Sequence, residues 1–184
     1  IAYLKKEIMQ QKKNFISVGY LQTNTLHDAF PIWYLTSFEY GHKFSKHTLI
    51  GRVNYSFLSS IDAVQYEVDW YPKLTQKKYA LLNFGISNDV LFPNYKVSAE
   101  IFHEDKQFTA SLGGKKLFFD TTNEVTMLTG HIGYNIKSYK IMYRNFYILQ
   151  DDSKGTFSHY VGFRKKFDEK DTYIQLEAMY GSAP

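Results

Sequence analysis

The stretches Arg52-Val53-Asn54-Tyr55-Ser56-Phe57 and Gln65-Tyr66-Glu67-Val68-Asp69-Trp70 decide the fold class, because polar residues alternate strictly with apolar or aromatic residues in both. Successive side chains of an extended strand point to opposite faces, so this alternation gives each strand one polar and one apolar face. The same pattern recurs from Phe15 almost to the end of the chain. Many such strands in succession predict an antiparallel sheet closed into a barrel.

Working outward from these two stretches, the alternation predicts about eleven strands, most of about 10 to 13 residues. The predicted strands span residues 15–23, 33–43, 47–58, 62–72, 77–87, 94–103, 107–119, 124–135, 138–149, 155–167 and 171–181. Ordinary strands average about 5 or 6 residues, whereas a tilted strand needs roughly 9 to 11 to cross a bilayer. The strand lengths therefore favour a transmembrane barrel.

The connections between the predicted strands alternate in kind. Several of those that follow odd-numbered strands are long, as at 24–32 and 88–93, whereas those that follow even-numbered strands are mostly short and charged, as at 73–76 and 104–106. Outer-membrane barrels have long extracellular loops and short periplasmic turns. A soluble up-and-down barrel, the alternative, would show less asymmetry.

Composition allows strands, but no helix, to cross a membrane. The 184 residues suffice for one sizeable domain and include 16 Tyr and 15 Phe, and aromatic residues make up 18% of the chain. The mean hydropathy is nevertheless −0.37. No run approaches the roughly 20 apolar residues of a membrane-spanning helix. Aromatic surface and polar groups are thus combined in the same strands, as in a barrel with a lipid face and a polar interior.

Several classes of protein are excluded by composition. The chain has no Cys, which removes disulfide scaffolds, Cys-based zinc sites and thiol catalysis. The net charge of +4 is dispersed and forms no basic stripe with stacking aromatics, so nucleic-acid binding is not indicated. Residues 1–13 predict a short amphipathic helical leader without the apolar core of a signal peptide. We expect two segments: this leader, which either stands alone or is the end of a longer segment, and a barrel domain over 14–184.

The apolar residues of the alternating pattern share one face of each strand and predict a lipid-facing surface. Many of its aromatic residues fall near strand ends, where amphipathic rings settle at the level of lipid headgroups. A large soluble aromatic core is the alternative reading. The expected membrane-interface aromatics are Tyr40, Phe57, Trp70, Phe108, Tyr134, Tyr139, Phe157 and Tyr180.

The polar residues of the alternating pattern share the other face of each strand and predict an interior lined by opposite charges. We expect a lumen charge network of Glu39, Arg52, Glu67, Asp69, Lys96, Glu100, Lys115, Arg144, Arg164 and Glu177. The same face carries Asn54, Gln65, Asn83, Ser98, Ser111, Lys140 and Gln175. Arg52 should lie near Glu67 or Asp69, and Lys96 with Glu100 near Lys115. Such a lumen is either plugged or a narrow polar pore, and charges that only brace the interior are the simplest interpretation.

Three longer blocks carry a family resemblance. These are Ile50-Gly51-Arg52-Val53-Asn54-Tyr55, Gln65-Tyr66-Glu67-Val68-Asp69-Trp70-Tyr71-Pro72-Lys73-Leu74 and Tyr79-Ala80-Leu81-Leu82-Asn83-Phe84-Gly85. With Phe92-Pro93, Ala110-Ser111-Leu112-Gly113 and Tyr180-Gly181-Ser182-Ala183-Pro184, they make residues 14–184 resemble the YaiO-family outer-membrane β-barrel domain.

The resemblance implies an outer-membrane barrel of poorly defined function, in some members preceded by a tetratricopeptide array. The leader at 1–13 would suit the end of such a periplasmic repeat module. Gly114 and Lys116 depart from the family pattern, since they stand where it tends to have aromatic residues. The chain stops at Pro184 after an odd-numbered strand, so we expect a fragment that lacks the closing strand or strands of a barrel with about 12 or more strands. We also expect this fragment to lack a signal peptide, because residues 1–13 contain no apolar core.

No catalytic pattern stands out. A Ser and its His base on one strand must be two residues apart to share a face, and none of the six histidines has Ser two residues later. Ser158 and His159 are adjacent, so they point to opposite faces. Glu67 and Asp69 could suggest glycosidase carboxylates, but neighbouring cations would hold both ionised. His103-Glu104-Asp105 lacks the convergent geometry of a metal site. We expect no catalytic residue, metal or cofactor.

The expected function is that of an integral outer-membrane β-barrel with a polar, ion-paired lumen and a structural or accessory role. Its expected surroundings are outer-membrane lipid, with a periplasmic protein or a surface polysaccharide as a candidate partner. The alternative is a narrow pore for small polar or anionic solutes, suggested by Arg52, Arg144 and Arg164. A second alternative is a lipid- or glycan-modifying enzyme of the outer membrane, which the missing His-x-Ser pattern disfavours.

Overall fold

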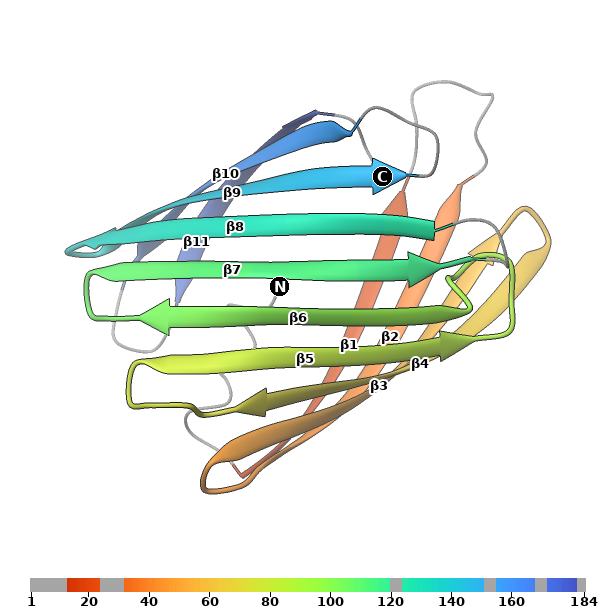
Figure 1. Ribbon diagram of the computed structural model, residues 1–184, viewed down its shortest axis with the longest axis horizontal. Coiled ribbons are helices and arrows are strands. Elements are labelled where there is room, and N and C mark those ends of the chain that lie inside the picture. Colours follow the sequence, from red (N-terminus) through yellow and green to blue (C-terminus); the bar gives the residue numbers. More distant parts are fainter. Residues whose placement is uncertain (1–12, 24–31, 120–123, 151–154, 168–171, 182–184) are drawn as a thin grey trace. The chain divides into compact units, whose positions relative to one another are not determined.

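The computed structural model describes residues 13–23, 32–119, 124–150, 155–167 and 172–181. These residues form eleven strands that are hydrogen-bonded in sequence order (Figure 1). The strands are β1 (Asn14–Thr23), β2 (Trp33–Lys43), β3 (His47–Leu58), β4 (Ile61–Pro72), β5 (Lys78–Ser87), β6 (Tyr95–Glu104), β7 (Phe108–Phe118), β8 (Glu124–Ile136), β9 (Tyr139–Gln150), β10 (Thr156–Lys166) and β11 (Tyr173–Gly181).

The prediction of an antiparallel up-and-down all-β fold is confirmed. Every predicted strand is present, and its ends lie within two residues of the predicted positions. The helical leader expected at 1–13 lies almost wholly outside the described residues. In the part of the chain that the structure describes, no helix has the length and apolar character needed to cross a membrane.

Burial on these strands is the reverse of that in a water-soluble protein. On β4, Tyr66 is 59% exposed, while the neighbouring Gln65 and Glu67 are 3% and 5% exposed. On β3, Asn54 is buried while Val53 is exposed. Soluble proteins bury their apolar side chains and rarely expose large continuous apolar surfaces. The exposed apolar face therefore fits an apolar surrounding medium.

The chain divides into two compact units, each of which is described by itself. Unit 1 comprises residues 1–72, 82–97 and 117–123, and unit 2 comprises residues 73–81, 98–116 and 124–184. In both units the backbone register places residues of like character opposite one another on neighbouring strands.

In unit 1 the register aligns a polar row and an apolar row across five strands. The polar row, from β1 to β5, is Ser17, Glu39, Arg52, Glu67 and Gly85. The row one residue along is Val18, Phe38, Val53, Tyr66 and Ile86, all exposed. A register slip of one residue would exchange the two faces, so the contrast between them specifies the register.

In unit 2 the same separation continues across β8 to β11. One row is Asn135, Lys140, Arg164 and Gln175. Its neighbour is Tyr134, Ile141, Phe163 and Leu176, all exposed. Both units therefore carry polar side chains on one face of the sheet and apolar side chains on the other.

The turn between β3 and β4 consists of only two residues. Ser59 and Ser60 have φ angles of 48° and 75°. Consecutive positive φ angles are typical of a type I′ turn, whose twist matches that of a two-residue β-hairpin. This connection follows an odd-numbered strand and is short, so the alternation of long and short connections has an exception here.

Candidate functional site

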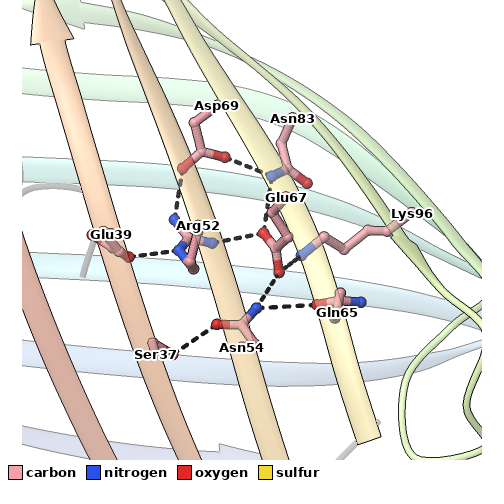
Figure 2. Close-up of polar contacts among 9 residues, drawn as sticks. All are labelled: Ser37, Glu39, Arg52, Asn54, Gln65, Glu67, Asp69, Asn83 and Lys96. Atoms are coloured by element: carbon pink, nitrogen blue, oxygen red, sulfur yellow. Dashed lines mark hydrogen bonds and ion pairs between the residues drawn. The ribbon is translucent and has the colours of Figure 1, made fainter.

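The largest polar cluster that we identify lies on the buried face of unit 1, where β2 to β6 bring charged side chains together (Figure 2). The polar row places Glu39, Arg52 and Glu67 directly opposite one another on β2, β3 and β4. Asp69 follows Glu67 at the next position on the same face of β4, and Lys96 reaches the cluster from β6. We call this cluster the Arg52 network.

Arg52 bridges three carboxylates. Its Nε atom donates to Glu39 Oε1 at 2.5 Å, its Nη1 atom to Glu67 Oε2 at 2.6 Å and its Nη2 atom to Asp69 Oδ2 at 2.7 Å. Figure 2 shows the guanidinium between Glu39 on one side and the two β4 carboxylates on the other. The planar fork of an Arg side chain can make such divergent contacts, which the compact ammonium of Lys cannot.

Glu67 accepts hydrogen bonds from four side chains. Besides Arg52, Lys96 Nζ lies 2.5 Å from Glu67 Oε1, Asn54 Nδ2 donates to the same oxygen at 2.8 Å, and Asn83 Nδ2 donates to Oε2 at 3.1 Å. The Glu67 side chain is only 3% exposed. A buried carboxylate stabilised by four donors is favoured in its ionised form and is a poor general acid.

Amides and hydroxyls extend the network beyond the charges. Asn83 Nδ2 also donates to Asp69 Oδ1 at 2.5 Å. Ser37 Oγ donates to Asn54 Oδ1 at 2.7 Å, and Asn54 Nδ2 donates to Gln65 Oε1 at 3.2 Å. Buried polar groups need such partners, because an unsatisfied one costs roughly 1 to 3 kcal/mol. The buried face of unit 1 is thus a connected polar network.

Gly85 makes the contact between Lys96 and Glu67 possible. It lies opposite Glu67 on β5, the strand between those two residues in the sheet order. A Cβ atom at Gly85 would lie 3.2 Å from Glu67 Cγ and 3.2 Å from Lys96 Cε. Because Gly85 has no side chain, the Lys96 side chain can cross β5 at this position and reach Glu67.

We expect Gly85→Val to weaken the protein by about 1 to 3 kcal/mol, since added methyl groups in a close-packed interior force neighbouring side chains to move. The branched side chain would displace Lys96 from Glu67. The free energy of unfolding in detergent micelles, measured by denaturant titration, is the test. Gly51→Val is the matched control, because a Cβ atom there meets no atom within 4 Å. Equal stability of the two variants would contradict this role of Gly85.

The expected pairings are reproduced in part. Arg52 contacts both Glu67 and Asp69. Lys96 pairs with Glu67. Glu100 contacts Ser111 at 2.5 Å and Arg144 at 3.1 Å, while Lys115 is half-buried on β7.

The remaining expected charges lie on β10 and β11 of unit 2. Arg164 Nε donates to Gln175 Oε1 at 2.6 Å, and its guanidinium lies 4.3 Å from the ring centroid of Tyr173. Glu177 accepts hydrogen bonds from Gln175 and Tyr160. Sequence reasoning placed Asn54, Gln65 and Asn83 on the polar face but not in the network. It missed Gly85, although a glycine at a polar-face position of a strand is a signal of close approach.

The expected interface aromatics all lie on the exposed face. Their exposed fractions range from 39% for Phe57 and Tyr139 to 84% for Tyr180. Phe108 and Tyr139 begin their strands, and Tyr180 is the second-last residue of β11. Their place at the headgroup level of a bilayer stays a prediction.

The adjacent Ser158 and His159 do not form a catalytic pair, and no metal-binding cluster is found among the described residues. Ser158 is 2% exposed on the inward face of β10, whereas His159 lies on the other face, with its Nδ1 atom 2.8 Å from the hydroxyl of Tyr143. Within the described ranges, no three His, Asp or Glu side chains are arranged to hold a metal ion.

Comparison with known proteins places this architecture in a family. No curated protein and no solved structure matches the chain. The family model described as the YaiO membrane beta barrel domain matches residues 13–184, which include all eleven strands. The inverted burial of the strands agrees with a membrane barrel. The chain therefore belongs to the YaiO family of membrane β-barrel domains.

Proposed function

We propose that this protein is a structural or accessory barrel of the outer membrane, and that the Arg52 network seals and stiffens the interior of unit 1. The observation that carries the proposal is the bridging of three carboxylates by Arg52, with side chains that are 3% to 15% exposed. Charges that line a water-filled pore remain hydrated. Here they are bonded to one another and shielded from water.

A buried ion-pair cluster of this kind suits a mechanical role better than a chemical one. Removal of several charges from water is costly, and only close contacts and additional hydrogen bonds compensate for that cost. The compensation requires fixed geometry, so the network favours a rigid sheet. Four donors on Glu67 also disfavour proton transfer by the best candidate carboxylate.

Recording from planar lipid bilayers that contain the full-length protein tests this proposal. We expect electrical silence, because the buried network excludes ions and water from this part of the interior. Stepwise ohmic openings would contradict a sealed barrel. Release of acyl or glycosyl groups from added outer-membrane lipid would contradict the non-catalytic part of the proposal. The candidate partner for an accessory role is a periplasmic protein or a polysaccharide.

A narrow pore for anionic solutes is the second candidate function. The observation that favours it is Arg144, which lies on the polar face of β9 in unit 2 and keeps 23% of its side chain exposed, on the same face as the buried cation Lys140. A pore lined by Arg and Lys prefers anions. If openings occur, the sign of the reversal potential across a KCl gradient decides whether they carry anions.

A further inference from the structure

A polar row crosses the exposed face of unit 2 between apolar rows. Asn145 on β9 and His159 on β10 are direct cross-strand partners. Gly130 on β8 lies opposite Asn145, and Tyr180 on β11 lies opposite His159. We call these four residues the Asn145 row. Its neighbours on the same face are Ile132, Tyr143, Val161 and Ala178 on one side and Leu128, Tyr147 and Phe157 on the other.

The polar members of the row lie on the face that a membrane barrel presents to lipid. Asn145 is the seventh of the 12 residues of β9, and His159 is the fourth of the 11 residues of β10. Polar groups that face hydrocarbon are costly unless they are hydrogen-bonded, and ionisable side chains in membrane-spanning segments indicate function. The row therefore requires a hydrogen-bonding partner from the bilayer.

His159 is oriented by two aromatic neighbours. Its Nδ1 atom lies 2.8 Å from the hydroxyl oxygen of Tyr143, and its ring is nearly parallel to that of Phe157, at an angle of 5°. The other ring nitrogen, Nε2, has no hydrogen-bond partner within the described ranges. Depending on the tautomer, this atom donates or accepts. His159 thus keeps one nitrogen for a partner outside the chain.

Asn145 carries an unused side-chain amide beside a gap at Gly130. A Cβ atom at Gly130 would lie 2.9 Å from Asn145 Oδ1 and, apart from its chain neighbours, would meet no other atom within 4 Å. Among the described residues, Thr129 donates to the backbone oxygen of Asn145, and no group bonds the side-chain amide. This amide offers two donors and one acceptor. A ligand at Gly130 could reach all three.

The depth of the row points to the outer leaflet. His159 is three residues from the start of β10, and Asn145 is five residues from the end of β9. With a rise of about 3.3 Å per residue and a tilt of about 40°, both lie roughly 8 to 13 Å below these strand ends, within one half of the hydrocarbon core. Connections after odd-numbered strands include the two longest, 24–32 and 88–94. Long connections of outer-membrane barrels are extracellular.

We propose that the Asn145 row binds a lipid of the lipid A class, the acylated glucosamine lipid of the outer leaflet. The amide and hydroxyl groups at the heads of its 3-hydroxyacyl chains supply both donors and acceptors below the headgroup. The glycerol esters of a phospholipid only accept hydrogen bonds, so they would leave Asn145 Oδ1 without a donor. The apolar rows on both sides of the Asn145 row would pack against the acyl chains.

Native mass spectrometry of the full-length protein in detergent micelles, titrated with purified lipid A, tests the site. We expect saturable binding of one lipid A per protein chain. Asn145→Leu keeps the approximate size of the side chain and should weaken binding about tenfold through loss of the amide hydrogen bonds. His159→Phe keeps a ring at this position and should also weaken binding, because it removes the unused nitrogen.

Thr36→Val is the matched control, because Thr36 is a polar residue on the exposed face of unit 1, between Tyr20 and Tyr55. It should bind lipid A as the parent does. Phosphatidylglycerol is the lipid control and should bind the parent and Asn145→Leu equally. Each variant replaces a lipid-facing polar side chain by an apolar one of similar size, so all should fold, as the heat-modifiable band on gels reports.

Equal affinity of the parent and Asn145→Leu for lipid A would overturn the proposal, as would equal affinity of the parent for lipid A and phosphatidylglycerol. A complex of two protein chains that Asn145→Leu dissociates would also overturn it, by assigning the row to a second copy of the chain. The proposal rests on the outer-membrane location proposed above. Failure of the parent to fold into a membrane would overturn both, whereas a folded, electrically silent parent that does not bind lipid A would overturn this inference alone.

Discussion

Arg52→Met is expected to destabilise the protein by about 3 to 5 kcal/mol, the usual effect of removing one partner from a buried ion-pair cluster. Methionine matches much of the side-chain volume of arginine, so the loss is one of charge and hydrogen bonds rather than of packing. Glu39, Glu67 and Asp69 would remain buried, and Lys96 would still pair with Glu67. Mutual repulsion of the carboxylates would add to the cost.

The measurement is the free energy of unfolding in micelles by denaturant titration. Because the variant could fail to assemble, the fraction that shows a heat-modifiable band on gels is the second readout. Arg52→Lys separates charge from geometry. It retains the charge but cannot make the divergent contacts of a guanidinium, so we expect an intermediate loss. A loss below about 1 kcal/mol for Arg52→Met would show that the network does not brace the sheet.

Lys77→Met is the matched control at an exposed ion pair. Lys77 Nζ lies 2.6 Å from Asp105 Oδ2, and the two side chains are 58% and 42% exposed. The hydrogen bond from Lys77 lowers the pKa of the Asp105 carboxyl. A carboxyl whose pKa is lower in the folded state stabilises the protein when the pH is above its unfolded-state pKa. This contribution is lost as the pH falls through the folded-state pKa. Solvent screens this pair, so we expect the unfolding midpoint at neutral pH to remain unchanged.

The strands and their faces could be predicted from the sequence because alternation with period two is a local property. Arg52 and Glu67 both follow from it, since Arg52 lies next to Val53 and Glu67 lies between Tyr66 and Val68. Their direct pairing additionally needs the register, which the two-residue turn at Ser59 and Ser60 supplies.

Contacts that skip a strand could not be predicted in the same way. Lys96 reaches Glu67 across β5 only because Gly85 has no side chain. Glu100 on β6 contacts Arg144 on β9, two strands that are not neighbours in the sheet order. Alternation gives the face of a residue but not the reach of its side chain across that face. The partners of long charged side chains therefore required the structure.

Tyr66→Arg is expected to block insertion of the barrel into a bilayer. Tyr66 lies mid-strand on β4 in the apolar row, flanked by Val53 on β3 and Ile86 on β5. It is 59% exposed, so its side chain projects from the sheet rather than into the network. An arginine that faces lipid near the bilayer midplane costs roughly 2 to 4 kcal/mol in barrels of this type.

Folding into vesicles of a short-chain phosphatidylcholine, followed by the heat-modifiable band on gels, measures the effect. Tyr66→Phe is the matched control, since it keeps the ring and the apolar character and should insert as the parent does. A further variant, Gln65→Arg, places the same charge one residue away on the opposite face. An arginine at position 65 meets Asn54 and the Glu67 cluster rather than lipid. This variant therefore tests whether the loss of membrane insertion depends on the face of β4 that carries the charge. If Tyr66→Arg inserted as efficiently as Tyr66→Phe, the exposed apolar face of β4 would not be the lipid-facing surface.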